Sequence, residues 1–154
     1  MQGEALGYPI RRVGIVPEKE VKVGVKRGAG PPPGYRWTVL VLDSAFKEAM
    51  AFLSEGQYQH LAMQVKELAR EGDPTHSVTN DVRSIEDFYE IRDKGGVLGN
   101  LNVRIFFTLE KNTSSLAVLG VIKKQNDGPT PAGDSIRMRR RMRKYLSGDY
   151  TRGP

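Results

Sequence analysis

The chain has 154 residues and a mass of 17.2 kDa, a length that suits one domain with an appendage. Hydrophobic residues make up 38% and charged residues 27%, a composition typical of a globular protein. The lack of cysteine excludes disulfides and thiol catalysis, and with only two histidines we expect no metal site and no cofactor. No run of 18 apolar residues suggests a membrane span, and residues 1–8 lack a signal-peptide pattern, which favours the cytoplasm.

The net charge of +6 is unevenly distributed along the chain. Residues 35–99 hold 7 basic and 11 acidic side chains, whereas residues 100–154 hold 11 basic and 4 acidic ones. A basic stretch on an acidic body favours a polyanionic partner, nucleic acid first and an acidic protein second. The alternative is a charge pattern that only keeps the protein soluble.

The first 34 residues are expected to form a basic extension. Two alternating stretches, residues 11–16 and 20–25, are separated by a Pro-Glu-Lys turn and predict a small hairpin. Residues 28–34, rich in glycine and proline, are typical of a linker. Three roles stay open for this extension: adding strands to a sheet edge, covering a cleft, or contacting a partner.

A strand and two helices are predicted after the linker. Residues 35–42 are rich in aromatic and β-branched side chains and favour a strand. Asp43 or Ser44 is the expected cap of a helix over residues 45–53. A second helix, packed against the first as a helical hairpin, ends at Gly72. Its apolar face contains Leu61, Val65, Leu68 and Ala69.

Three strands and a last helix complete the expected fold. Residues 72–84 are polar and predict a loop, and strands are expected at residues 86–93, 101–110 and 115–123. Thr130 as cap and Pro131 at the first helical position begin a helix that runs to about residue 146. The order β-α-α-β-β-β-α predicts an α+β fold with a small, mostly antiparallel sheet.

Three motifs in these elements resemble the RelE/ParE toxin superfamily, in its HigB-like and phage-derived branch. Phe88-Tyr89-Glu90-Ile91-Arg92 resembles the family's aromatic-x-Glu-Leu-Arg strand, and Val103-Arg104-Ile105-Phe106-Phe107 resembles its Tyr-Arg-Val-x-Tyr/Phe strand. Lys123-Lys124 followed by Thr130-Pro131 is similar to the family's Lys-Lys…Thr-Pro segment. The resemblance covers residues 35–147 as a toxin domain, with 1–34 as an extension and 148–154 as a tail.

The resemblance implies the toxin of a type II toxin–antitoxin pair, a metal-independent endoribonuclease that cuts mRNA, commonly on the ribosome. Its implied partners are mRNA, the ribosome and an antitoxin of the helix-turn-helix type, with no membrane. In such a reaction the ribose 2′-hydroxyl attacks the neighbouring phosphate, and fixed cations stabilise the charge that develops. This sequence departs from the family in a Gln-Asn-Asp-Gly loop, residues 125–128, which places an acidic group beside the basic site.

The implied catalytic residues lie on the matching strands and the last helix. Arg92 and Arg104 would form a phosphate clamp, since the guanidinium fork grips phosphate with two donors; alternatively they pair with nearby acids. Only one of Lys123 and Lys124 can face the site, because neighbouring strand residues point to opposite faces. Glu90 is a further candidate, either as a general base or, more readily, as a group that orients an arginine. Tyr145 is another: its ring could stack on an RNA base or its hydroxyl could donate a proton, and the alternative is that it only packs in the core.

The last helix carries six cations that would repel one another without an anionic neighbour. RNA backbone is the favoured neighbour, and an acidic antitoxin segment or solvent are the alternatives. The candidate RNA-binding residues are Arg137, Arg139, Arg140, Arg141, Arg143 and Lys144. His60 and His76 lie outside the matching motifs.

Two other functions remain open from the sequence. The first is a non-catalytic protein of the same superfamily that binds a protein target, as ParE-type members resemble inhibitors of DNA gyrase. The second is a basic nucleic-acid-binding module. The cationic set on the matching strands favours the nuclease, because a toxin that blocks a protein needs no phosphate clamp.

Overall fold

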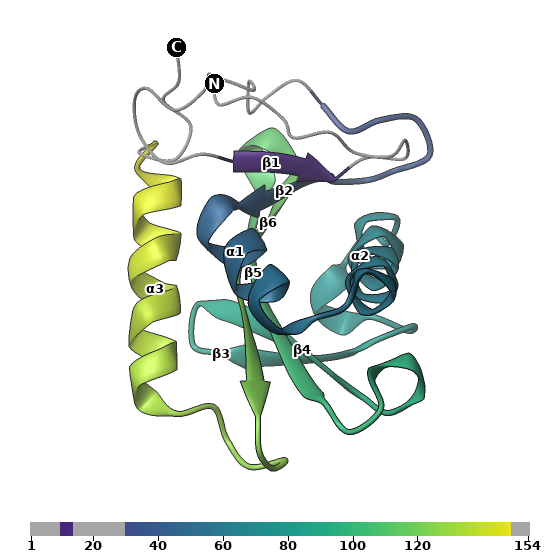
Figure 1. The fold of residues 1–154 in the computed structure, drawn as a ribbon. Coiled ribbons are helices and arrows are strands. Elements are labelled where there is room, and N and C mark those ends of the chain that lie inside the picture. The colour runs from purple at the N-terminus through teal and green to yellow at the C-terminus, as the bar shows by residue number, and fades with distance from the viewer. Residues whose placement is uncertain (1–9, 14–29, 149–154) are drawn as a thin grey trace, which may run out of the picture.

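The computed structural model describes residues 10–13, in backbone only, and residues 30–148 (Figure 1). The described strands are β1 (Ile10–Val13), β2 (Thr38–Leu42), β3 (Asp81–Ile85), β4 (Phe88–Lys94), β5 (Asn102–Glu110) and β6 (Ser115–Lys124). The helices are α1 (Asp43–Phe52), α2 (Glu55–Ala69) and α3 (Ala132–Leu146), with one single-turn 3₁₀ segment between α2 and β3 and two more between later strands. The α+β class is confirmed.

The strands form one sheet in the order β1-β2-β6-β5-β4-β3. The sheet is mostly antiparallel, as predicted, and β2 alone among the described strands pairs in parallel, with β6. β6 is central and almost wholly buried, as its apolar run indicates. β1 pairs with β2 and extends the sheet edge, whereas most of the predicted hairpin at residues 11–16 and 20–25 lies outside the described residues.

Three sequence predictions are wrong at element boundaries. The expected loop at residues 72–84 contains β3, an edge strand whose side chains are mostly exposed, so that it shows no apolar alternation. Thr130 does not cap the last helix: Pro131 is the residue before it, and the Thr130 hydroxyl bonds to side chains of the sheet instead. Nor does Asp43 or Ser44 cap α1, because Asp43 is already its first residue.

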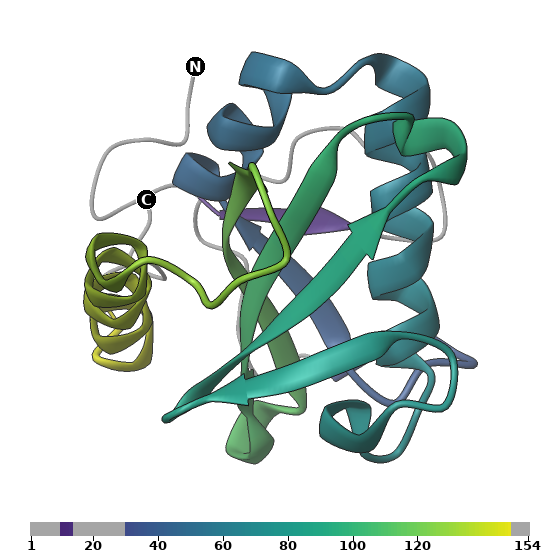
Figure 2. The same ribbon diagram turned by 90° about the horizontal axis from the view of Figure 1, so that it is seen from below.

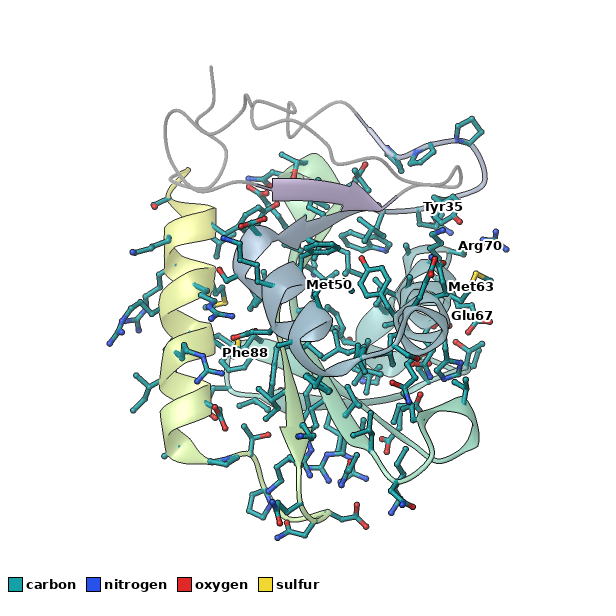
Figure 3. The ribbon with its side chains drawn as sticks, in the orientation of Figure 1. Tyr35, Met50, Met63, Glu67, Arg70 and Phe88 are labelled. Atoms are coloured by element: carbon teal, nitrogen blue, oxygen red, sulfur yellow. The ribbon has the colours of Figure 1, made fainter. Side chains whose placement is uncertain are left out.

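The helices cover the two faces of the sheet. α1 and α2 pack on one face, and α3 lies against the other (Figure 2). Figure 3 shows Phe88 on the α3 side, where the Arg139 guanidinium lies 6.0 Å from its ring centre. Gly120 on β6 allows the close approach of α3, because a Cβ there would collide with the Met138 side chain. The α3 face of the sheet is therefore apolar toward β6 and polar toward the ends of β4 and β5.

Candidate functional site

Arg92 and Arg104 lie directly opposite each other on β4 and β5. Both point to the sheet face that carries α3, because Arg104 is two residues from Phe106, which pairs with Gly120 beneath that helix. The side chain of Arg92 is 18% exposed, whereas Arg104 is completely buried. The alternation of the two strands therefore brings both predicted arginines together.

Glu90 links the two arginines. Its carboxylate is 1% exposed and accepts a 2.6 Å hydrogen bond from Nε of Arg92 and another of 2.6 Å from the Thr130 hydroxyl. Nη1 of Arg104 lies 3.8 Å from the same carboxylate. Glu90 thus fixes both guanidinium groups, and its oxygens are already occupied by donors.

Arg104 is held by the segment that follows β6. Its Nη1 donates to the Thr130 hydroxyl at 3.0 Å and its Nη2 to the Gly128 carbonyl at 2.5 Å, while its buried Nε has no partner among the described residues. Burial lowers the pKa of Arg104 from its ordinary value, and the Glu90 carboxylate opposes this shift. The group stays charged at neutral pH, because an arginine begins from a very high pKa.

Residues 125–130, here called the cover segment, close the polar end of this face. Nζ of Lys124 donates to Oδ1 of Asn126 at 3.2 Å and to the Pro129 carbonyl at 3.1 Å. Nη1 of Arg92 donates to the Asp127 carbonyl at 3.2 Å. Arg92, Arg104, Lys124 and Glu90 therefore form one cluster, here called the arginine cluster, beneath the cover segment.

Lys123 and Tyr145 lie away from the arginine cluster. Lys123 points to the opposite face of the sheet, where its Nζ is 5.8 Å from the Phe52 ring centre. Tyr145 is completely buried, and its hydroxyl donates to Oε1 of Glu110 at 2.8 Å. Glu110 is six residues from Arg104 along β5, a separation of about 20 Å. Tyr145 serves packing, as the alternative interpretation of the helix face indicated.

The six cations of α3 divide into two groups. Arg141 donates through both terminal nitrogens to Glu48 on α1, at 2.9 and 2.8 Å, and Arg137 pairs with Asp134 at 2.9 Å. Arg139 pairs with carboxylates of the β3–β4 turn. The outward-facing members without a partner among the described residues are Arg140 and Arg143, and Lys144 is half-buried. Arg137, Arg139 and Arg141 are thus paired inside the fold, and Arg140 and Arg143 form an exposed basic stripe.

The histidines pair with aspartates. His60 lies 2.8 Å from Asp93, and His76 lies 2.9 Å from Asp73. The Thr75 hydroxyl and His76 hold the pKa of Asp73 below its ordinary value. Within the described part of the chain, no group of three or more histidine, aspartate or glutamate side chains could hold a metal ion. None of the helices described there is long and apolar enough to cross a bilayer.

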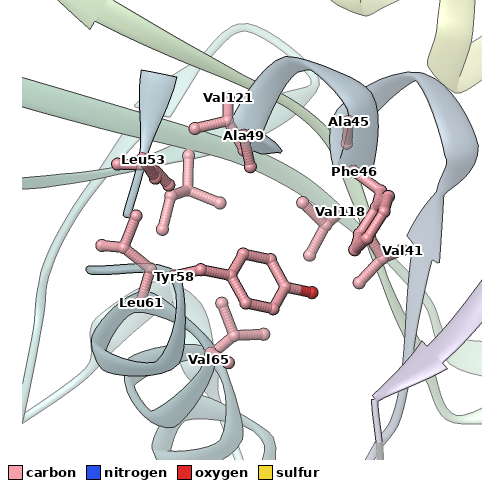
Figure 4. A pocket seen from close by; sticks show the side chains of 12 residues that line it. Val41, Ala45, Phe46, Ala49, Leu53, Tyr58, Leu61, Val65, Val118 and Val121 are labelled. Atoms are coloured by element: carbon pink, nitrogen blue, oxygen red, sulfur yellow. The ribbon is translucent and has the colours of Figure 1, made fainter. Parts of the chain in front are cut away.

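An apolar pocket lies on the other face of the sheet, between α1, α2 and the strands (Figure 4). The Tyr58 ring crosses it and meets Phe46 edge to face, with 5.7 Å between ring centres. Its cavity volume is about 40 Å³, and apart from Tyr58 its lining is wholly apolar. Because its lining holds no charged side chain and Tyr58 is its one polar residue, the arginine cluster is the candidate site.

Sequence reasoning missed Lys94 and Asn102 at this site, and it did not predict the contacts that Asp127 and Thr130 make there. Lys94 is two residues beyond Arg92, so the strand period alone places it on the same face. Asn102 pairs with Lys124 in the register of β5 and β6, a relation that no local pattern reveals. No protein-family model matches the chain, and a search of curated proteins finds no significant match.

Proposed function

We propose that this protein is a toxin of the RelE/ParE type that cleaves mRNA, with the arginine cluster as its active site. The observation that carries the proposal is the pairing of Arg92 with Arg104 across two strands, with Lys124 at the end of the third. Three cations on one face can contact the non-bridging oxygens of a single phosphodiester. The element order, with two helices after the first strand of the domain and a basic helix at its end, also supports the proposal.

The chemistry assigns different roles to the cluster residues. Arg92 and Arg104 bind the scissile phosphate and stabilise the charge that builds on it as the 2′-hydroxyl attacks. Glu90 is a positioning residue, because its oxygens already accept hydrogen bonds from Arg92 and Thr130. Lys124 lies at the rim, where its ammonium can donate a proton to the departing 5′-oxygen, while the proton of the attacking 2′-hydroxyl passes to solvent water. RNA backbone beyond the scissile phosphate lies along the exposed arginines of α3.

This reaction requires the cover segment to move. Arg104 has no exposed surface, and two of its donors are bonded to Gly128 and Thr130. A phosphate reaches the guanidinium only by replacing those two acceptors. Phosphate oxygens are stronger acceptors for a guanidinium than a carbonyl or hydroxyl oxygen is, so the exchange is favourable once RNA is bound.

A second candidate function, that of a non-catalytic protein-binding member of the superfamily, is favoured by a different observation. Arg104 and Tyr145 are both completely buried and bonded within the protein, as in a network that only stabilises the fold. In that case the exposed stripe of α3 binds an acidic protein such as a gyrase surface or an antitoxin.

Induced expression with mapping of mRNA 5′ ends separates the two candidates. The variants are Arg92→Gln, which removes the partly exposed clamp residue, and Lys123→Gln as a matched control for a cation on the opposite face. The nuclease predicts new 5′ ends with the wild type and with Lys123→Gln, and none with Arg92→Gln. Growth arrest without new ends supports the protein-binding function, and new ends that persist in Arg92→Gln exclude the arginine cluster as the active site.

A further inference from the structure

The Asp127 carboxylate lies between two donors at the open end of the sheet, Lys94 and Asn102. Its Oδ2 accepts a 2.7 Å hydrogen bond from Nζ of Lys94, and its Oδ1 accepts one of 3.1 Å from Nδ2 of Asn102. The Asp127 carbonyl accepts from Nη1 of Arg92. The hydrogen bond and charge of Lys94 hold the pKa of Asp127 below its ordinary value, so the carboxylate is ionised at neutral pH.

These donors belong to the chain's strands, whereas Asp127 belongs to the cover segment. Lys94 and Asn102 lie opposite each other in the register of β4 and β5, so a twisted sheet fixes their spacing without help from the cover segment. An ammonium, an amide and a guanidinium are the donor types that bind a phosphate. The Asp127 carboxylate, an anion with two acceptor oxygens, occupies the place that the Lys94 and Asn102 donors offer to a phosphate.

The occupant is weakly held and has room beside it. Lys94 and Asp127 are 62% and 67% exposed, and ion pairs this open contribute little to stability. The adjoining polar cavity measures about 390 Å³. Two other carboxylates line it, and each has its own partner: Asp81 pairs with Arg83, and Asp93 lies against His60.

We propose that Lys94 and Asn102, beside Arg92, form a second phosphate-binding subsite, which takes the phosphodiester next to the scissile one and from which RNA displaces Asp127. This inference rests on the proposed function for the identity of the ligand. Displacement of Asp127 draws Gly128 and Thr130 with it, because Gly128 is the next residue along the chain and Thr130 follows two residues later. The same event therefore exposes Arg104, so that binding at the second subsite opens the first.

The test measures binding of the full chain to a fluorescent 2′-O-methyl RNA hexamer, which lacks the attacking hydroxyl and is not cut. Asp127→Asn removes the occupant's charge and keeps its shape, and we expect its affinity to rise about fivefold at constant salt. Asp81→Asn is the matched control, because it removes the same charge from the same cavity but from a residue paired with Arg83. We expect its affinity to rise by less than about twofold. Adding Lys94→Gln to Asp127→Asn removes the gain.

Three results overturn the inference: equal gains for Asp127→Asn and Asp81→Asn, no gain for Asp127→Asn, or a gain that survives Lys94→Gln. Inorganic phosphate is the second probe, and its binding is measured as the rise that it causes in the thermal unfolding temperature of the same variants. Stabilisation of Asp127→Asn by inorganic phosphate without a gain for RNA overturns the assignment to RNA backbone. If Asp127→Asn raises the affinity for the RNA hexamer but the wild type cleaves no mRNA in the expression assay, the subsite is supported and the nuclease function is contradicted. The failure of one proposal is therefore distinguishable from the failure of the other.

Discussion

Removal of the Glu90 charge is the perturbation whose outcome the structure defines best. Glu90→Gln keeps the side-chain shape but leaves Arg92 and the buried Arg104 facing each other without a counter-charge. Removing one partner of a buried ion pair costs about 3–5 kcal/mol, and the partial exposure of Arg92 favours the lower end. With a slope of about 2 kcal/mol/M, a loss of about 3 kcal/mol lowers the urea midpoint by about 1.5 M.

Arg104→Met provides the comparison. It removes two hydrogen bonds and the desolvated guanidinium, while Glu90 keeps Arg92 and Thr130 as donors. Gly128 and Thr130 are half-exposed and can turn to water. We therefore expect a loss of about 1–2 kcal/mol, smaller than for Glu90→Gln. Equilibrium urea unfolding measures both variants, with Glu86→Gln, whose side chain is 69% exposed, as a control near wild type. A greater loss for Arg104→Met than for Glu90→Gln would refute the reasoning.

Three other predictions follow from single contacts. Tyr145→Phe loses the hydrogen bond to Glu110, so its unfolding free energy should fall by about 1 kcal/mol while any RNA cleavage persists; lost cleavage in a folded variant contradicts this. Arg140→Gln should weaken RNA binding and reduce the salt slope by about one, whereas Arg141→Gln should mainly lower the thermal unfolding temperature, because it breaks the pair with α1. The lowered pKa of Asp127 means that its carboxylate contact is present above the ordinary pKa of 3.8 and is lost as the pH falls through the lowered value. A side-chain carboxyl NMR titration with a midpoint at or above 3.8 would contradict that contact.

Much of the fold can be predicted from local patterns in the sequence. The apolar run of β6 indicates a central strand, and the period of 2 in β4 and β5 places Arg92 and Arg104 on one face. β3 escapes prediction because an edge strand with exposed side chains has no apolar alternation. The predicted helix cap at Thr130 is wrong because the Thr130 hydroxyl donates to the buried Glu90 carboxylate. This long-range hydrogen bond outweighs the local preference of a threonine hydroxyl for a helix end.

The site is less predictable than the fold because long-range contacts determine it. Charge counting alone treats α3 as six free cations, but Glu48 on α1 neutralises part of that charge from almost a hundred residues away. The separation of Lys123 from Lys124 follows from strand alternation, whereas the choice of Lys124 requires the sheet register. Nothing local reveals that the acidic loop next to the basic site closes over it with Asp127.

The central claim is that the arginine cluster promotes attack by a ribose 2′-hydroxyl. The most direct measurement uses a translation reaction with purified protein and an mRNA that carries one 2′-deoxynucleotide at the mapped cut. We expect cleavage of the all-ribose mRNA, leaving a 2′,3′-cyclic phosphate and a 5′-hydroxyl, and no cleavage at the deoxy position. Cleavage at the deoxy position, or ends that carry a 5′-phosphate, would contradict it.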